Sequence, residues 1–307
     1  MIIIRMTGGL GNQMFQYALY LKLKSMGRDV KFDDKTEYEL SNARPIMLWA
    51  FGIDYPKASK EEINQMTDGF LYLSHRIRRK IFGRKSLEYQ ENSCNYDGQI
   101  LKKEQAYLTG YFQSEKYFKE IESDVREAFT FHSSIFENID ADLKKKINAY
   151  EKEIEENLSV SIHIRRGDYL ENSEVYGGNC TAEYYEKAIH IIKDKFPQTV
   201  FFVFSNDDAW AQEWCKEQEK EQGLRFVPVT DTPEELGYLD MYLMSKCKHH
   251  IIANSSFSWW GAWLNASPDK MVLAPARWFN NQTCYDIYTK EMMKISPEGT
   301  IVEDDTK

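Results

Sequence analysis

The stretch SIHIRRGDYL, residues 161–170, starts as an alternating strand and ends in two adjacent arginines, a glycine and an aspartate. From residue 160 onward, apolar and polar side chains fall on opposite faces of a predicted strand. The apolar set is Val160, Ile162 and Ile164, and the polar set is Ser161, His163 and Arg165. We expect the apolar face to lie in a core and the polar face to be wet or occupied. Because arginine binds phosphate through two parallel hydrogen bonds, this strand end raises the possibility of an anion site.

Around this stretch, strands rich in β-branched and aromatic residues alternate with helical segments. The expected strands are 159–164, 199–205, 224–229, 250–255 and 270–275, and the helices between them are 181–196, 207–223, 232–247 and 257–266. Such alternation is typical of a parallel sheet that is covered by helices on both faces. The C-terminal half is therefore predicted to be a doubly wound α/β domain.

The N-terminal half begins in the same way. Residues 2–6 read as a strand, TGGLGNQ at 7–13 as a glycine loop, and the following segment as a helix that ends at Gly27. The pattern from 33 to 135 is irregular, and 141–157 reads as an exposed helix. A chain of 307 residues suits two domains, and we expect them to span 1–140 and 141–307.

Composition excludes several classes of function. The net charge of −9 argues against non-specific nucleic-acid binding, so any anion site must be local. The apolar run at the N-terminus is too short for a signal peptide or a membrane span. Five scattered cysteines without a CxxC pair indicate neither a disulfide framework nor a zinc site, and a cytoplasmic location is expected. The basic run 75–85 reads as a solvated helix face, with at most a peripheral membrane contact as the alternative.

Four polar clusters fall where predicted strands end, which is where doubly wound domains bind ligands. They are HIRRGDY at 163–169, FSNDD at 204–208, ANSSFSWW at 253–260 and GGLGNQ at 8–13. Hydroxyls and free backbone N–H groups at a helix start can hold an anion. Each cluster also has a plainer interpretation: Asp168 and the aspartates at 207–208 as helix-terminal charges, Arg166 paired with a surface acid, and the serines as helix caps.

The glycine pattern is a weak dinucleotide fingerprint, because Met14 stands where a third glycine or alanine belongs. No cluster of carboxylates or histidines indicates a metal, and no nucleophile elbow supports a hydrolase triad. An arginine and helix-terminal dipoles can stabilise a departing diphosphate without a divalent ion. These features favour a nucleotide-sugar transferase with neither metal nor other cofactor.

The chain resembles the inverting α-1,2-fucosyltransferases that use GDP-fucose. The likeness rests on GGLGNQMFQYA near the start, HIRRGDY, FSNDD and LMSKCKHHIIANSSFSWWGAWL at 243–264, which occur in order over most of the chain. The resemblance implies two Rossmann-like domains facing across a cleft, the GT-B type of glycosyltransferase fold. It also implies an acceptor side at 1–140, a GDP-fucose side at 141–307, and a terminal galactose as the acceptor.

The resemblance further assigns roles to individual residues. Arg165 would bind the β-phosphate and be the main catalytic residue, with Asn12 near the reacting sugar. Asp207, with Asp208 as a rival, would accept hydrogen bonds from guanine, and Arg166 and Asp168 would hold the loop. The remaining donor-binding candidates are His163, Asn254, Ser255, Ser256, Ser258, Gly9, Gly11 and Gln13.

Three alternatives stay open. The chain could use another nucleotide sugar on the same fold, or it could be a non-catalytic carbohydrate-binding module, as Trp49, Tyr55 and the many tyrosines suggest. A dinucleotide oxidoreductase is disfavoured by the broken glycine pattern. The sequence determines neither the natural acceptor, nor a general base, nor the oligomeric state.

Overall fold

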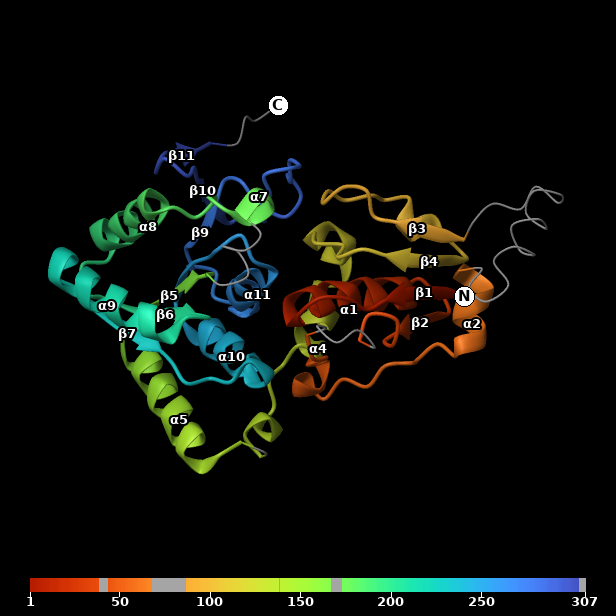
Figure 1. Cartoon of the computed structure of the whole chain (residues 1–307), viewed down its shortest axis with the longest axis horizontal. Coiled ribbons are helices and arrows are strands. Elements are labelled where there is room, and N and C mark those ends of the chain that lie inside the picture. The colour runs from red at the N-terminus through yellow and green to blue at the C-terminus, as the bar shows by residue number, and fades with distance from the viewer. Residues whose placement is uncertain (39–43, 68–86, 138, 167–172, 304–307) are drawn as a thin grey trace. The chain divides into compact units, whose positions relative to one another are not determined.

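A computed structural model describes the chain except for residues 39–43, 68–86, 138, 167–172 and 304–307. It divides into two compact units, each with its own sheet (Figure 1). The N-terminal unit comprises Met1–Thr130 and Tyr285–Ile287, and the C-terminal unit comprises Phe131–Cys284 and Tyr288–Lys307. The structure thus changes unit at 130–131 rather than at the expected 140–141. It also returns three late residues to the first unit, which the sequence did not indicate.

The N-terminal unit contains a parallel sheet of order β2-β1-β4-β3. Its strands are β1 (Ile2–Arg5), β2 (Val30–Asp33), β3 (Glu88–Gln90) and β4 (Ala106–Thr109), and its helices are α1 (Leu10–Ser25), α2 (Lys60–Thr67) and α4 (Glu122–Ala128). The isoleucines of β1 are fully buried, as expected of a central parallel strand covered on both faces. Strands β3 and β4 lie in the region whose pattern reads as irregular, because strands this short show little alternation.

The C-terminal unit contains a sheet of order β11-β10-β9-β8-β5-β6-β7, parallel except between β10 and β11. Its strands are β5 (Leu158–Ile164), β6 (Thr199–Ser205), β7 (Arg225–Val229), β8 (His249–Ile251), β9 (Val272–Pro275), β10 (Met292–Ile295) and β11 (Ile301–Val302). Its helices are α5 (Ala141–Glu156), α7 (Ser173–Tyr176), α8 (Ala182–Lys195), α9 (Asp208–Gln222), α10 (Tyr238–Lys246) and α11 (Ser256–Leu264). The predicted doubly wound α/β domain is confirmed.

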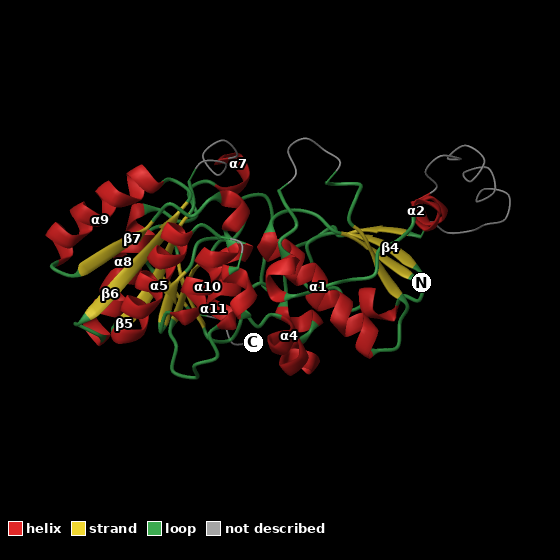
Figure 2. Cartoon of the chain, turned by 90° about the horizontal axis from the view of Figure 1, so that it is seen from below, coloured by secondary structure: helices red, strands yellow, loops and turns green. Residues whose placement is uncertain are grey.

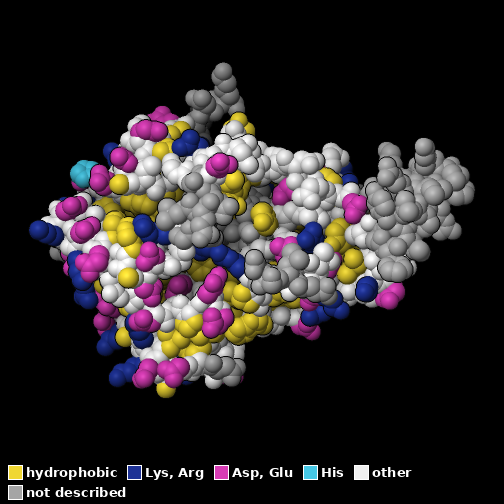
Figure 3. Space-filling model, viewed as in Figure 1, with side chains coloured by type: hydrophobic (Ala, Val, Ile, Leu, Met, Phe, Trp, Pro, Cys, Tyr) yellow, Lys and Arg dark blue, Asp and Glu magenta, His cyan; other side chains and the backbone are white. Residues whose placement is uncertain are grey.

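Helices cover both faces of this sheet, with α8 and α9 on one side and α5, α10 and α11 on the other (Figure 2). The expected helix 232–247 is interrupted: Glu234–Leu236 form a 3-10 turn, and α10 begins only after Gly237. Pro233 accounts for the start of the 3-10 turn after Thr232, since a proline favours a helix start and disfavours helical geometry in the residue before it. On the face drawn in Figure 3, acidic and basic side chains of this unit are interspersed.

Strand β5 is buried on both faces. Val160, Ile162 and Ile164 pack against α8, as expected for the apolar face. The opposite face is not wet, because Ser161 and His163 are only 3% and 5% exposed. This face is covered by the side that carries α11, where the rings of His163 and Phe257 lie 5.8 Å apart.

Burial of a polar strand face requires internal hydrogen bonds. Ser161 Oγ lies 2.8 Å from His250 Nδ1, and Asn265 Nδ2 lies 2.9 Å from His250 Nε2. Because the Asn265 amide donates to Nε2, His250 Nδ1–H donates to Ser161. Burial, helped by Lys270, holds the pKa of His250 well below its ordinary value of 6.5, so the ring is neutral at neutral pH.

This network predicts a loss of stability in mild acid. The unfolded chain takes up a proton near the ordinary histidine pKa, whereas folded His250 does not, so stability falls as the pH drops below that value. Between about pH 7.5 and 5.5, wild type should lose roughly 1.4 kcal/mol relative to His250→Gln. Urea unfolding at both pH values measures this. His190→Gln, at an exposed histidine, is the control and should follow wild type; equal slopes for wild type and His250→Gln would contradict the assignment.

Candidate functional site

The C-terminal sheet reverses its winding at β5. The chain runs from β5 to β6 and β7 in one direction, and then crosses to β8 on the other side of β5. Ligands of doubly wound folds bind at such a reversal, beyond the carboxyl ends of the strands. His163 and Arg165 stand at the end of β5, and Asn254 and Ser255 follow β8. The structure therefore brings the first and third polar clusters to one sheet edge.

The serines after β8 form the start of α11. Ser255 caps the helix, since its hydroxyl accepts from the N–H of Phe257 at 3.3 Å. Ser256 is half-buried in the first turn. Ser258 is 2% exposed, and its hydroxyl accepts from Ala253 N and donates to Ser255 O. The backbone of this helix start can meet an anion, whereas Ser258 shapes the turn from inside.

Asn254 serves as a tie between loops. Its Nδ2 donates to Trp278 O at 3.0 Å and to Tyr176 O at 3.3 Å, and its Oδ1 accepts from Cys180 Sγ at 3.5 Å. At 2% exposure, this amide holds three segments together. The sequence signal of a polar residue at a strand end does not distinguish such a tie from a ligand contact.

The second arginine of the motif is held by α9. Arg166 Nε lies 3.3 Å from Asp207 Oδ2, its guanidinium stacks 4.3 Å from the Trp210 ring centroid, and its backbone N–H donates to Asn206 Oδ1 at 2.8 Å. Asp207 Oδ1 accepts from the N–H of Trp210 and caps α9. Both oxygens of Asp207 are thus used within the loop.

Asp208 and a carboxylate that the sequence analysis missed lie at the end of β7. Asp208 Oδ2 accepts from the backbone N–H of Asp231 at 2.8 Å. Asp240, in the first turn of α10, has an Oδ1 that is shielded from solvent, and the shielded hydroxyl of Thr232 is its polar neighbour. Burial raises the pKa of Asp240 to about 7, and the Asp208 carboxylate adds to this rise. A single aspartate inside a helical pattern gives no signal in sequence.

The N-terminal sheet has a similar reversal at β1, which lies between β2 and β4. Gly8 adopts a positive φ of 74° in the loop after β1, and a Cβ there would lie 2.5 Å from Asn12 Nδ2. Asn12 Oδ1 accepts from Gln113 Nε2, beyond β4, at 2.7 Å. Asn12 is therefore positioned at this reversal, and it is linked to the loop that follows β4.

The other members of the glycine cluster are built into the unit. Gln13 is fully buried, donates to Gly8 O and Pro45 O, and accepts from Met47 N. A Cβ on Gly9 would lie 3.2 Å from Arg44 Cδ, and Gly11 is buried in α1. Gln13 thus ties the segment after β2 to the glycine loop instead of facing a ligand.

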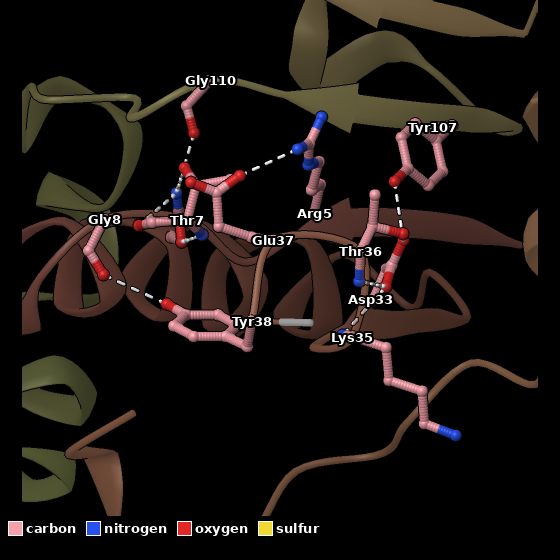
Figure 4. Close-up of polar contacts among 11 residues, drawn as sticks. Arg5, Thr7, Gly8, Asp33, Lys35, Thr36, Glu37, Tyr38, Tyr107 and Gly110 are labelled. Atoms are coloured by element: carbon pink, nitrogen blue, oxygen red, sulfur yellow. Dashed lines mark hydrogen bonds and ion pairs between the residues drawn. The ribbon is translucent and has the colours of Figure 1, made fainter. Parts of the chain in front are cut away.

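Figure 4 shows the polar contacts behind this loop. Arg5 pairs with Glu37 at 2.8 Å, and Tyr38 OH donates to Gly8 O at 3.1 Å. Asp33 accepts from the hydroxyls of Thr36 and Tyr107. Burial acts to raise the pKa of Asp33, but these hydrogen bonds outweigh it and lower the pKa. Asp33 is therefore an ionised structural group.

Some expectations fall elsewhere. Asp168 and the basic run 75–85 lie outside the described residues.

Cys94 and Cys284 are disulfide-bonded, so the expectation of no disulfide was wrong; Cys180, Cys215 and Cys247 are free. Among the described residues, no group of three or more metal-binding side chains occurs, and no helix has the length and apolarity that a membrane crossing needs.

The chain is similar in fold and in sequence to glycosyltransferases. A mutant of Arabidopsis thaliana FUT1 in complex with GDP superposes with a TM-score of 0.51 at 12% identity, covering 89% of this chain and 70% of that one. This likeness concerns the fold, which is an α/β glycosyltransferase fold of the GT-B type. The chain belongs to glycosyl transferase family 11, whose model matches residues 1–296. The family predicted from the motifs is confirmed.

Named relatives span nearly the whole chain. An α-1,2-colitosyltransferase of Escherichia coli is 35% identical over 92% of this chain and 93% of its own. The O-antigen biosynthesis glycosyltransferase WbnK of the same species is 34% identical over 91% and 95%. The galactoside 2-alpha-L-fucosyltransferase Sec1 of Mus musculus is 24% identical over 89% and 67%.

The internal role of Asn254 predicts an effect on stability. Asn254→Ala removes the donor to Trp278 O, one of the two side-chain donors to Tyr176 O and the acceptor of the Cys180 thiol, which should lower the free energy of unfolding by about 1–3 kcal/mol. Asn281→Ala, at an exposed asparagine of the same unit, should change it by less than about 0.5 kcal/mol. Chemical denaturation of both variants tests this. If Asn254→Ala were as stable as wild type, the structural role of Asn254 would be wrong, and a role in ligand binding would be favoured instead.

Proposed function

We propose that the chain transfers L-fucose from GDP-β-L-fucose to the 2-hydroxyl of a terminal galactoside, giving an α-1,2 linkage with inversion and without a metal ion. The observation that carries the proposal is the meeting of Arg165 and the start of α11 at the winding reversal of the C-terminal sheet. Membership of family 11 and the name of the mouse relative support the reaction. The GDP complex of a structure with the same fold supports the nucleotide.

In this proposal the C-terminal unit binds the donor. The bond between C1 of fucose and the β-phosphate oxygen breaks, and its electron pair stays on GDP. Arg165 and the N–H groups that begin α11 stabilise this negative charge, which is the work that a divalent cation would otherwise do. The acceptor hydroxyl attacks C1 from the opposite face, so the configuration inverts, and the proton of that hydroxyl is released to the solvent. The N-terminal unit binds the acceptor, with Asn12 near the reacting sugar.

Colitose is a second candidate sugar, favoured by the relative named for colitosyl transfer. It is fucose without its 3-hydroxyl, so the two donors differ by one hydrogen-bonding group. Parallel assays with GDP-fucose, GDP-colitose, GDP-mannose and UDP-galactose, with lactose as acceptor and EDTA present, separate these possibilities. Use of GDP-mannose or a UDP-sugar alone would overturn the donor assignment, and a need for added divalent cation would overturn the metal-free mechanism.

We place this activity in the cytoplasm, which the three free cysteines support. The disulfide-bonded Cys94 and Cys284 run against that location, because cytoplasmic thiols are kept reduced.

Arg165 provides the sharpest test of the mechanism. Arg165→Ala should lower kcat for transfer by about 10²- to 10³-fold or more, because a donor aimed at the developing charge is lost. Arg165→Lys keeps the charge but loses the bidentate geometry, so its kcat should lie between that of wild type and that of Arg165→Ala. The matched control is Arg225→Ala, whose side chain is 60% exposed and pairs with Glu153; its activity should stay unchanged. Near-normal turnover by folded Arg165→Ala would contradict the assigned role.

The guanine contact follows from the unused hydrogen-bonding capacity near β7. Guanine presents N1–H and N2–H as donors, and a carboxylate is the acceptor that matches them. Each oxygen of Asp207 already accepts one hydrogen bond within its loop, whereas the shielded Oδ1 of Asp240 has only the Thr232 hydroxyl beside it. We therefore assign this contact to Asp240 in preference to Asp207, and Asp208, whose Oδ2 accepts from Asp231 N, stays its rival.

This assignment predicts a pH-dependent affinity for GDP. The ionised form of Asp240 accepts both hydrogen bonds, and its pKa is about 7. GDP affinity should therefore weaken as the pH falls through that value, by up to about tenfold per unit below it. Calorimetric titration of GDP should show this in wild type and in the exposed-residue control Asp269→Asn. Asp240→Asn should bind weakly with a flat profile; an unchanged profile in that variant would remove Asp240 from the site.

A further inference from the structure

Three residues from late in the chain, Tyr285–Ile287, return to the N-terminal unit; we call them the strap. Two backbone N–H groups of the strap bond one side chain of that unit. Asn95 Oδ1 accepts from Tyr285 N at 2.6 Å and from Asp286 N at 3.3 Å. The strap thus has a defined backbone position on the loop that follows β3.

Side chains of the strap anchor it further. The Asp286 carboxylate accepts from Tyr96 N at 2.9 Å and forms an ion pair with Lys116. Ile287 is only 1% exposed. Cys284, immediately before the strap, is disulfide-bonded, as is Cys94, immediately before Asn95. Hydrogen bonds, an ion pair, apolar burial and disulfide bonding therefore all restrain this short segment.

The side chain of Tyr285 is the exception to this burial. It is 71% exposed, the highest value among the large hydrophobic residues that are exposed in the described chain. A ring on a restrained backbone loses little conformational entropy when it binds a partner. Because the backbone of the strap is fixed by these contacts, the exposed Tyr285 ring is attached at a defined position on the surface.

A second exposed tyrosine, Tyr111, is presented in a similar way beyond β4 and is 39% exposed. Glu91 fixes its backbone: one carboxylate oxygen accepts from Tyr111 N at 2.7 Å and the other from Phe112 N at 3.1 Å. Phe112 has a positive φ of 53°, an uncommon conformation for a bulky residue, which Glu91 helps to hold.

One row of aromatic rings links the two tyrosines. The Phe112 and Tyr117 ring centroids lie 6.0 Å apart, and those of Tyr117 and Tyr96 lie 4.8 Å apart. Tyr96 in turn donates its N–H to Asp286 of the strap. Tyr111 directly precedes Phe112 at one end of this row, and Tyr285 directly precedes Asp286, which bonds Tyr96 at the other end, so the backbones of both tyrosines adjoin the same aromatic row.

We propose that Tyr285 and Tyr111 form an aromatic platform that binds the sugar rings of the acceptor glycan. An exposed phenol ring offers a flat apolar face and a polar edge, which match the C–H face and the hydroxyls of a galactoside. Carboxylates at the platform are already committed, Glu91 to backbone N–H groups and Asp286 to Tyr96 and Lys116. The site therefore suits a neutral sugar. This inference rests on the proposed function, since it names where that reaction takes its acceptor.

Kinetics of Tyr285 variants test the platform. Tyr285→Ala should raise KM for lactose roughly tenfold, while KM for GDP-fucose and the slow hydrolysis of GDP-fucose without acceptor stay unchanged. Tyr285→Phe and Tyr285→Trp keep a stacking ring and should retain near-normal KM. Met26→Ala, at another exposed apolar residue of the same unit (42% exposed), is the control and should resemble wild type.

A purely structural strap would behave differently. It would lower kcat and the melting temperature together in Tyr285→Ala, with KM for lactose unchanged, and that result would overturn the platform. Direct titration with lactose separates this failure from failure of the proposed function. If wild type transfers no fucose yet binds lactose, and Tyr285→Ala does not bind it, the platform stands and the reaction is wrong. If the Ala variant transfers and binds as wild type does, the platform is wrong and the reaction stands.

Discussion

The parallel pairing of β5 with β6 on one side and β8 on the other is the constraint on which the rest of the C-terminal unit depends. It makes β5 a central strand covered on both faces, and it places the winding reversal beside its carboxyl end. Polar side chains on such a strand are tolerated only when their hydrogen bonds are satisfied. His250 and Asn265 meet this requirement for Ser161. The strand can then carry His163 and Arg165 to the sheet edge at which α11 begins.

The same requirement explains the buried amides. Gln13 in the N-terminal unit and Asn254 in the C-terminal unit each bond loops that are distant in sequence. A buried polar group without a partner costs about 1–3 kcal/mol, so each amide sets the position of the loops that satisfy it. Such amides hold the loops at the sheet edges in place. The side chains of these loops that make no internal hydrogen bonds are therefore also held in defined positions.

Several site residues could be predicted because strand ends are visible in sequence. The HIRRGDY motif follows a clear alternating run, and the serines follow another, so their meeting at one edge was foreseeable from parallel pairing. The distinction between Asn254, which bonds three loop segments, and Ser256, which is half-buried at the helix start, was not foreseeable, because both are short polar residues in one loop. Asp240 gave no signal either, since its raised pKa comes from burial and from the Asp208 carboxylate and not from any spacing. The short strands β3 and β4 lack enough residues for a period to show.

The sequence by itself determined the α/β class, the alternation in the C-terminal half, the family and the motif arginine, because periodicity and local motifs depend on neighbouring residues. Only the tertiary structure decided which polar groups are consumed by internal hydrogen bonds and which remain available. It also decided that Tyr285–Ile287 belong with the N-terminal unit. Both outcomes depend on contacts between residues far apart in the chain, such as Asn95 with Tyr285, and no local pattern records such contacts.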